Sequence, residues 1–310
     1  MRKYNQENFQ ELVDKALENP NLATVRPVVE KEFLHYDLLY VLDREGLLDG
    51  LAFQGGTAVR LCYGGRRFSE DLDFACGTDF TSMQLVTMKE CILDYLTDRY
   101  GLEVTVKEPK SLRNNPAYAD RMVDMWQIAV TTAPEQRDVP KQRIKLDMAS
   151  MEAYTGDYQP LVRNYDFLPD GYEDILIFTE DKSEIMADKL VSLPATQTHV
   201  RHRDIWDLAY LSQERATLRS DLVEKKLADY KIEDFDAKLQ STLDNLPGII
   251  DGKPFRDEMS RFLPADVYDR TFSQAKFSSF LKQRVSGLLM DLQDAMNPDL
   301  NQSDEPGFRM

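Results

Sequence analysis

The pattern of hydrophobic and polar positions changes its period along the chain. Apolar residues recur at helical spacing over Tyr4–Leu17, Val28–Arg44 and Ser82–Tyr100, so we expect a helix in each segment. An apolar strand and a Gly55-Gly56-Thr57 turn follow the second helix. Elsewhere the pattern alternates with a period of two or forms a short apolar run, which is typical of strands. The expected strands of a mixed or antiparallel sheet are 102–107, 125–131, 142–149 and 175–179.

After the last of these strands the pattern is helical almost throughout. We expect helices at 180–193, 204–213, 218–230, 234–246, 255–261, 265–272 and 277–296, with Pro194 ending the first. The fold class is therefore α/β (α+β), a mixed sheet flanked by helices and followed by an α-helical carboxy-terminal domain. No sharp linker separates the parts. We predict a core with a helical lead-in at 1–180, a helical domain at 181–296 and a flexible tail at 297–310.

Composition narrows the class of protein. The chain has 310 residues and 42% hydrophobic residues, and its apolar runs are too short to span a bilayer, so we expect a cytoplasmic protein. Its three cysteines and three histidines show no spacing typical of a disulfide framework or a zinc site. The net charge of −16 opposes nonspecific binding to nucleic acid, although a local basic groove remains compatible with it, and it favours a basic protein partner.

The segment 51–75, LAFQGGTAVRLCYGGRRFSEDLDFA, carries the candidate chemistry. It predicts a strand, a glycine turn, a short helix and a second strand bearing Asp71 and Asp73. Residues two apart on a strand point to the same face, so the two carboxylates can hold divalent metal beside a phosphate. Backbone N–H groups of Gly55 and Gly56 can approach an anion in the turn. Together these features predict a site for a nucleoside triphosphate (NTP).

Further residues fit nucleotidyl transfer, in which two Mg²⁺ ions activate a hydroxyl and stabilise the leaving pyrophosphate. Asp147, on the predicted strand 142–149, can complete a three-carboxylate metal set if its strand lies beside that of Asp71 and Asp73. The hydroxyls of Thr57 and Ser69 can bond the phosphates, and Lys189 is a candidate counter-charge. The candidate nucleotide-binding residues are Gly55, Gly56, Thr57, Arg60, Ser69 and Lys189.

Each of these features also has a plain structural interpretation. Acidic pairs such as Asp71 and Asp73 are often only solvated, although their place after the glycine turn argues against this here. Asp147 can face solvent at a sheet edge, and Lys189 can be an ordinary exposed lysine of a helix. The arginines around the turn, Arg60 among them, can likewise be solvated side chains.

The motifs resemble those of a known family. GGTAVR followed by RFSEDLDF is similar to the nucleotidyltransferase signature, a GG[ST] turn and a D-x-D pair, and more closely to the AbiEii/AbiGii family of abortive-infection toxins. IKLDM at 144–148, EIMADKL at 184–190 and RHRDIWDL at 201–208 resemble that family's later motifs. The resemblance covers about residues 33–211; beyond these we recognise only generic helices.

The resemblance implies a metal-dependent nucleotidyltransferase, commonly the toxin of a toxin–antitoxin pair, which in some members modifies the acceptor end of tRNA. It makes Asp71, Asp73 and Asp147 metal ligands, Lys189 a triphosphate contact, and Asp204 a site residue that orients Lys189 or Arg203. An antitoxin protein is the implied partner. The acidic chain lacks an extended basic face, which leaves protein or small-molecule acceptors open. A module that binds NTP without chemistry is the remaining alternative.

Overall fold

The computed structural model describes residues 7–113, 122–136, 138–169 and 171–297. Contacts divide the chain into two units, which we describe separately. The first contains the residues up to Asp181 together with Ser260–Tyr268, and the second contains Lys182–Met259 and the residues from Asp269 onward. The sequence placed Ser260–Tyr268 in the helical part, whereas its contacts are with the first unit. Tyr4 and the predicted tail beyond Asn297 lie outside the described residues.

A mixed seven-stranded sheet forms the centre of the first unit, in the order β3-β4-β5-β2-β1-β7-β6 among the described residues. β2 pairs in parallel with β5 and β1 in parallel with β7, while the other neighbours are antiparallel. The mixed sheet expected from the sequence is confirmed. The strands are β1 Ala52–Gln54, β2 Leu72–Ala75, β3 Val104–Lys107, β4 Val123–Val130, β5 Gln142–Ala149, β6 Asp157–Pro160 and β7 Leu176–Thr179.

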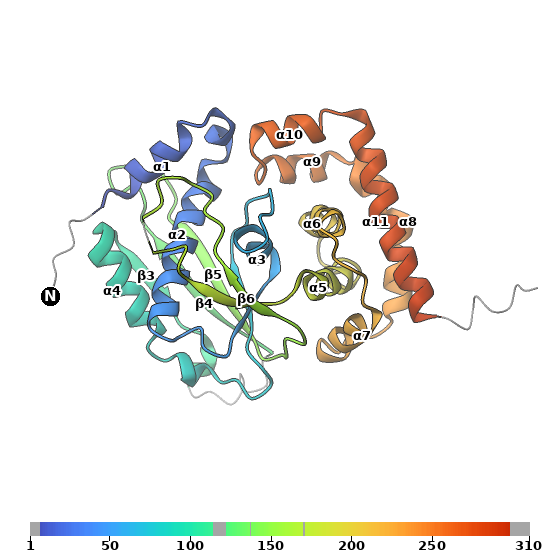
Figure 1. The fold of residues 1–310 in the computed structure, drawn as a ribbon, viewed down its shortest axis with the longest axis horizontal. Helices are drawn as coiled ribbons and strands as arrows, with labels where there is room; N and C mark the ends of the chain where they lie inside the picture. The colour runs from blue at the N-terminus through green and yellow to red at the C-terminus, as the bar shows by residue number, and fades with distance from the viewer. Residues whose placement is uncertain (1–6, 114–121, 137, 170, 298–310) are drawn as a thin grey trace, which may run out of the picture. The chain divides into compact units, whose positions relative to one another are not determined.

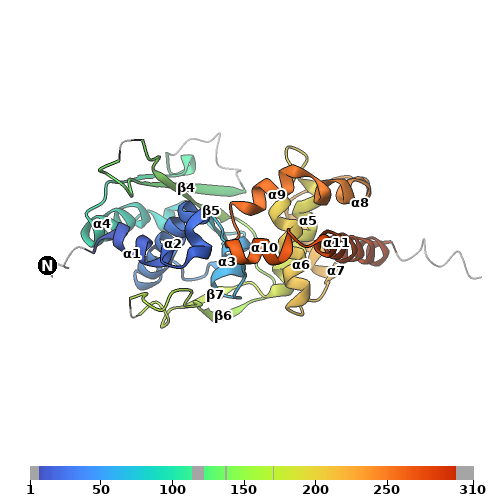
Figure 2. The ribbon, with the colours of Figure 1, turned by 90° about the horizontal axis from the view of Figure 1, so that it is seen from above.

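Helices α1, α2 and α4 cover one face of this sheet (Figures 1 and 2). Helix α4 ends where Gly101 adopts a left-handed conformation with φ of 67°, which glycine takes at little cost. The helices of the first unit are α1 Phe9–Leu17, α2 Arg26–Arg44, α3 Gly55–Leu61 and α4 Met88–Tyr100, with short 3₁₀ turns at Pro20–Val25, Ser82–Leu85 and Lys110–Arg113.

Alternation along β5 separates the two faces of the sheet. Ile144, Leu146 and Met148 are buried beneath the helices, whereas Arg143 and Lys145 are exposed and Asp147 is half-buried. Successive side chains of a strand point to opposite faces, so the last three share the face that α1, α2 and α4 leave open. We call this the open face.

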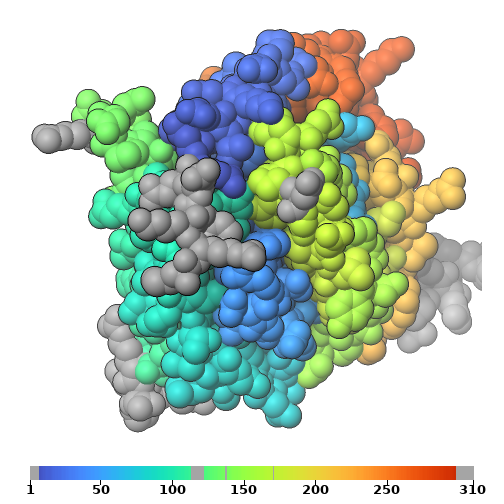
Figure 3. All heavy atoms as spheres, turned by 60° about the vertical axis from the view of Figure 1, so that its left-hand side comes forward, coloured from blue at the N-terminus to red at the C-terminus, as the bar shows by residue number. Residues whose placement is uncertain are grey.

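A buried polar network ties α2 to α4 on the covered side. The carboxylate of Asp37 accepts hydrogen bonds from Arg99 at 2.6 Å, Tyr100 at 2.8 Å and Tyr172 at 2.6 Å. The ring of Tyr172 also lies 5.3 Å from that of Tyr40 on α2. On the surface shown in Figure 3, yellow-green residues from the segment after β6 lie beside blue residues from the first part of the chain. The irregular segment predicted at 161–172 is thus anchored by side chains.

The returning segment Ser260–Tyr268 is attached to the first unit through its backbone. The Phe68 N–H donates to the Phe262 carbonyl at 2.8 Å, and both side chains are almost fully buried. Phe68 lies between the glycine turn and Asp71 in the sequence. The segment that packs against the site region therefore comes from late in the chain.

The second unit is helical. Lys226 is only 1% exposed and its ammonium pairs with Glu184 at 2.8 Å and Asp188 at 3.2 Å, which joins α7 to α5. No helix in the described part of the chain is long and apolar enough to cross a membrane. The helices after the sheet are α5 Lys182–Ala195, α6 His202–Gln213, α7 Ser220–Asp229, α8 Phe235–Asp251, α9 Lys253–Ser260, α10 Ala265–Thr271 and α11 Ala275–Met296.

Two predicted helix ends are wrong. Helix α5 includes Pro194 in its last turn, and α8 runs through Pro247 to Asp251, although the sequence predicted that these helices end at Leu193 and Leu246. Proline removes one backbone donor and one hydrogen bond. Four apolar side chains of α8, Phe235, Leu239, Leu246 and Ile250, are buried, so packing along the helix offsets that loss.

Candidate active site

The glycine turn sits where β1 passes into α3. Gly55 is the first residue of α3 and has φ of +76°, a conformation that L side chains rarely adopt. A Cβ atom at Gly55 would lie 2.6 Å from Oδ2 of Asp73. Glycine is therefore required both by the backbone conformation and by the close approach of this carboxylate. The turn and the first carboxylate strand form one compact unit.

Asp73 and Asp147 are neighbours across the sheet. They are register partners in the parallel pair β2–β5, and Gln54 is the partner of Asp73 on the other side. The adjacency that the sequence left open is therefore present. Adjacent strands lie about 4.8 Å apart, so the two carboxylates share a small region of the open face.

Asp71 lies one residue before β2 and is fixed at both ends. Its backbone carbonyl accepts a hydrogen bond from the Thr57 hydroxyl, and its Oδ1 accepts one from the Lys145 N–H at 3.0 Å. The first bond ties Asp71 to α3 and the second ties it to β5. All three acidic residues therefore converge on the same part of the first unit.

The convergence of the three acids changes the pKa of Asp147. Burial, followed by the charges of Asp73 and Asp71, raises the pKa of Asp147 to about 6, and Lys145 opposes the shift. One of its oxygens, Oδ1, is buried and has no hydrogen-bond partner among the described residues. A buried acceptor without a partner is costly, and such groups gather at functional sites. The position favours an incoming cation or proton.

The side chains as they stand do not form a closed metal cage. Within the described ranges no group of three His, Cys, Asp or Glu side chains is arranged to hold a metal ion. The chemistry of the donors nevertheless fits Mg²⁺, which prefers carboxylate oxygens and retains several waters. The unpartnered oxygen of Asp147 and the mutual repulsion of the acids also fit a divalent cation.

Arg67 is a residue of this region that the sequence did not single out from its neighbours. It is 4% exposed, while Arg66 beside it is exposed. Its Nη1 donates to the Phe68 carbonyl at 2.9 Å, and a Cβ at Gly56 would clash with its Nη2. The same Cβ would lie 3.1 Å from Oγ of Ser69. Its burial and its packing against the second glycine distinguish Arg67 from Arg66, and spacing along the sequence does not reveal them.

Two predicted nucleotide contacts are engaged elsewhere. The guanidinium of Arg60 pairs with Glu32 on α2 at 2.7 Å, donates to the Gly65 carbonyl at 2.9 Å and lies over the ring of Phe68. The Thr57 hydroxyl is fully buried and donates to the Asp71 carbonyl. Both residues hold the site's framework, so the contacts of Arg60 and of the Thr57 hydroxyl do not support phosphate binding.

Lys189 and Asp204 form a pair in the second unit. The Lys189 ammonium is buried and lies 3.1 Å from Asp204 and 3.7 Å from Asp207. Asp204 also pairs with Arg201 and accepts a hydrogen bond from Ser192 at 2.7 Å. Burial alone would raise the pKa of Asp204, but Lys189 and Arg201 hold it well below its usual range. Asp204 thus fixes the position of Lys189, whereas Arg203 pairs with Glu258.

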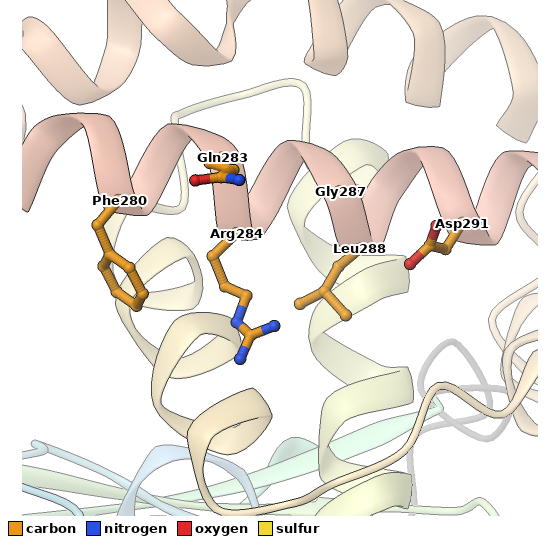
Figure 4. Close-up of a pocket in the computed structure, with 6 residues that line it drawn as sticks. All are labelled: Phe280, Gln283, Arg284, Gly287, Leu288 and Asp291. Atoms are coloured by element: carbon orange, nitrogen blue, oxygen red, sulfur yellow. The ribbon is translucent and has the colours of Figure 1, made fainter.

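A separate hollow of about 310 Å³ lies along α11 in the second unit. Figure 4 shows Phe280, Arg284 and Leu288 projecting from one side of the helix, as spacing by four residues requires. None of the predicted site residues lines this hollow. Gln283, Gly287 and Asp291 complete its lining, in which Asp291 is the single carboxylate.

Comparisons with known proteins agree with the motifs. The profile of the family described as nucleotidyl transferase AbiEii toxin, type IV TA system, matches residues 37–297. MenT4, a nucleotidyltransferase toxin from Mycobacterium tuberculosis H37Rv, has a similar fold with a TM-score of 0.56 and 17% identity, covering 94% of each chain. JHP933 from Helicobacter pylori matches with a TM-score of 0.40 and 18% identity, over 90% of this chain and 98% of that chain.

The comparison with curated proteins gives no match. The family match covers well over half of the chain and includes all five residues predicted to act in catalysis, Asp71, Asp73, Asp147, Lys189 and Asp204. The shared fold with MenT4 extends over nearly the whole chain. The chain therefore belongs to the AbiEii nucleotidyltransferase toxin family of type IV toxin–antitoxin systems and is a nucleotidyltransferase.

Proposed function

We propose that this nucleotidyltransferase transfers a nucleoside monophosphate from an NTP to a hydroxyl of RNA, with tRNA as the favoured acceptor, in the cytoplasm. The observation that carries the proposal is the pairing of Asp73 with Asp147 across β2 and β5 beside Gly55. Support also comes from the raised pKa of Asp147 and its unpartnered oxygen. A protein that only binds NTP gains little from three acids placed together.

Asp71, Asp73 and Asp147 would hold divalent metal, and we propose two Mg²⁺ ions. Once bound, the metal would supply charge neutralisation for the triphosphate and the acceptor oxygen. Asp147, with its pKa of about 6, is suited to take a proton from the acceptor hydroxyl. Hydrogen bonds from the Lys145 N–H and the Thr57 hydroxyl fix the position of Asp71.

The glycine turn and the basic residues would bind the triphosphate. The backbone N–H groups of Gly55 and Gly56 would approach the phosphates, and Ser69, which lies beside Gly56, would donate a hydrogen bond to them. For Lys189 and Asp204 we retain the predicted roles: Lys189 counters the triphosphate charge, and Asp204 positions its ammonium. Arg60 is omitted from this set because Glu32 already binds it.

The direct test incubates the purified chain with each labelled NTP, Mg²⁺ and total RNA. We expect label in RNA with the native protein and about 100-fold less with Asp73→Asn or Asp147→Asn. Asp79→Asn is the matched control, because Asp79 is exposed and outside the site. Label in protein or in a small molecule would replace the RNA acceptor, and no label anywhere would contradict transfer.

The toxin assignment also predicts a cellular effect and an antitoxin partner. Expression of the native chain should arrest growth, and Asp73→Asn should relieve the arrest although the protein still accumulates. Co-expression of the protein encoded beside this chain should restore growth if that neighbour is the antitoxin. Equal arrest by the native and Asp73→Asn chains would separate toxicity from nucleotidyl transfer.

A further inference from the structure

Three cations occupy the open face of the sheet close to the carboxylates. Lys107 on β3, Gln127 on β4 and Lys145 on β5 are register partners, so they form one row across three strands. Arg143 lies two residues before Lys145 on the same strand, in a row with Ala129 and Thr105. Strand geometry separates Lys107 from Lys145 by about 10 Å and Arg143 from Lys145 by about 7 Å. All three cationic side chains are exposed.

These cations have no carboxylate partner within 4.0 Å in the part of the chain that the structure describes. Glu103, at the end of the same face, is bound by Lys141 at 2.9 Å and by the Thr131 hydroxyl at 3.0 Å. The row residues between the cations are Thr105, Gln127 and Ala129, which are neutral. A chain of net charge −16 thus keeps a local positive strip at this place.

The strip leads toward the reacting groups. Lys145 is two residues before Asp147 on β5, so the two side chains lie on the same face about 7 Å apart. The backbone N–H of Lys145 binds Asp71, and its ammonium lowers the pKa of Asp147. A polyanion lying on the strip would therefore have one end beside the carboxylates.

We propose that the open face of β3, β4 and β5 is the track on which the acceptor RNA lies, with its phosphates paired to Lys107, Arg143 and Lys145 and its terminal hydroxyl beside Asp147. The inference rests on the proposed function, in which RNA is the acceptor. The rows contain no aromatic residue on which bases could stack, and cations with neutral polar neighbours suit phosphate contacts. The track therefore binds the backbone independently of sequence.

The first measurement is binding of a short fluorescein-labelled RNA with a free 3′ hydroxyl to the full chain, followed by anisotropy. The triple variant Lys107→Gln, Arg143→Gln and Lys145→Gln should weaken binding about 10-fold or more. Each phosphate contact contributes about 0.7 to the salt slope for single strands, so the slope of log K against log salt should fall by about 2.

The matched control removes the same charge elsewhere. Lys253, Arg256 and Lys276 are exposed on α9 and α11, and their triple change to Gln should alter RNA affinity by less than about threefold. The charge-retaining pair Lys107→Arg and Lys145→Arg should keep the native affinity. Unchanged thermal unfolding of the triple variants would show that each one folds.

Binding of a fluorescent NTP analogue in the absence of RNA separates this inference from the proposed function. The double variant Lys107→Gln and Arg143→Gln, which keeps Lys145 beside Asp71 and Asp147, should bind the analogue as the native chain does and label RNA more weakly. If the native chain labels RNA and the triple variant of Lys107, Arg143 and Lys145 binds RNA with native affinity, the track is wrong while the function stands. If the native chain labels only protein or small molecules, the RNA acceptor and the track both fail.

Discussion

The surroundings of Asp147 disfavour the ionised form of its carboxyl group. Its side chain is half-buried on β5, next to Asp73, and one oxygen has no partner among the described residues. Ionisation is therefore harder than in an unfolded chain, where the pKa is 3.8. Function and stability make opposite demands on this one residue, as is common in active sites.

Asp147→Asn should stabilise the metal-free protein at neutral pH. A carboxyl whose pKa is raised to about 6 on folding costs no stability well below its unfolded pKa of 3.8, and the cost grows as pH rises through 3.8 to about 6. Two pKa units correspond to about 3 kcal/mol, and partial exposure reduces this to about 1 kcal/mol. Urea unfolding of both proteins at pH 4 and pH 7.5 measures the difference.

The stabilisation should be much smaller at pH 4, where Asp147 is protonated in the folded chain and only about half ionised in the unfolded chain. Mg²⁺ should raise the melting temperature of the native chain more than that of Asp147→Asn, because the variant lacks one of the proposed metal ligands. A variant no more stable than the native chain at pH 7.5 would contradict the raised pKa.

Gly55→Ala should damage both stability and activity. An alanine at this position would have to adopt φ of +76°, and its Cβ atom would lie 2.6 Å from Asp73 Oδ2. We expect a loss of about 1–3 kcal/mol in the free energy of unfolding, from the backbone strain and the displaced carboxylate. Gly248→Ala, at a helical position with open space around it, is the control and should cost nothing. Native stability in Gly55→Ala would show that the turn can relax.

At the scale of the elements, the sequence predicts a strand correctly where apolar and polar residues alternate over several positions. β5 spans the predicted residues 142–149, and β4 begins two residues before the predicted 125–131 and ends one residue earlier. β6, with the sequence DYQP, was not predicted, because it is short and has a proline at its end. An edge strand of this kind tolerates proline and needs no alternating pattern.

The site was predictable only as far as local spacing reaches. Asp73 and Asp147 were identified by their place on strands, and their pairing required only that β5 lie beside β2. The ion pair of Arg60 with Glu32 was not predictable, because Glu32 lies 28 residues earlier and meets Arg60 only in the folded protein. The hydrogen bond from the Thr57 hydroxyl to the Asp71 carbonyl, 14 residues later, was not predictable for the same reason.

The junction of α5 and α7 depends on one buried cation. Lys226→Met should cost about 3–5 kcal/mol, because it leaves Glu184 and Asp188 without their counter-charge. Urea unfolding of the native and variant chains measures the loss. Adding Glu184→Gln to Lys226→Met should restore part of it, and a loss below about 1 kcal/mol would contradict a buried charge cluster.

At the scale of the whole molecule, the first unit is not continuous in sequence. It contains residues up to Asp181 and also Ser260–Tyr268, whose Phe262 carbonyl binds the N–H of Phe68. Both phenylalanines are almost fully buried. A fragment that ends after the last strand therefore lacks part of the first unit, although the change of sequence pattern at that place predicts a domain boundary.

A fragment of residues 1–181 should be less stable than the same fragment joined through a flexible linker to residues 260–268. The difference should be about 2 kcal/mol, the contribution of burying one phenylalanine side chain. Denaturant unfolding of the two fragments measures it, and the linked fragment with Phe262→Ala should behave like the short one. Equal stability of all three would show that the returning segment adds nothing.

The discontinuous first unit also sets an order of events during synthesis. A ribosome makes the chain from its amino terminus, so the strands that bear Asp73 and Asp147 emerge long before the partner of Phe68. Residues 182–259, which are helical and belong to the second unit, must be translated in between. A nascent chain therefore carries its acids in an unfinished unit until Ser260–Tyr268 has been synthesised.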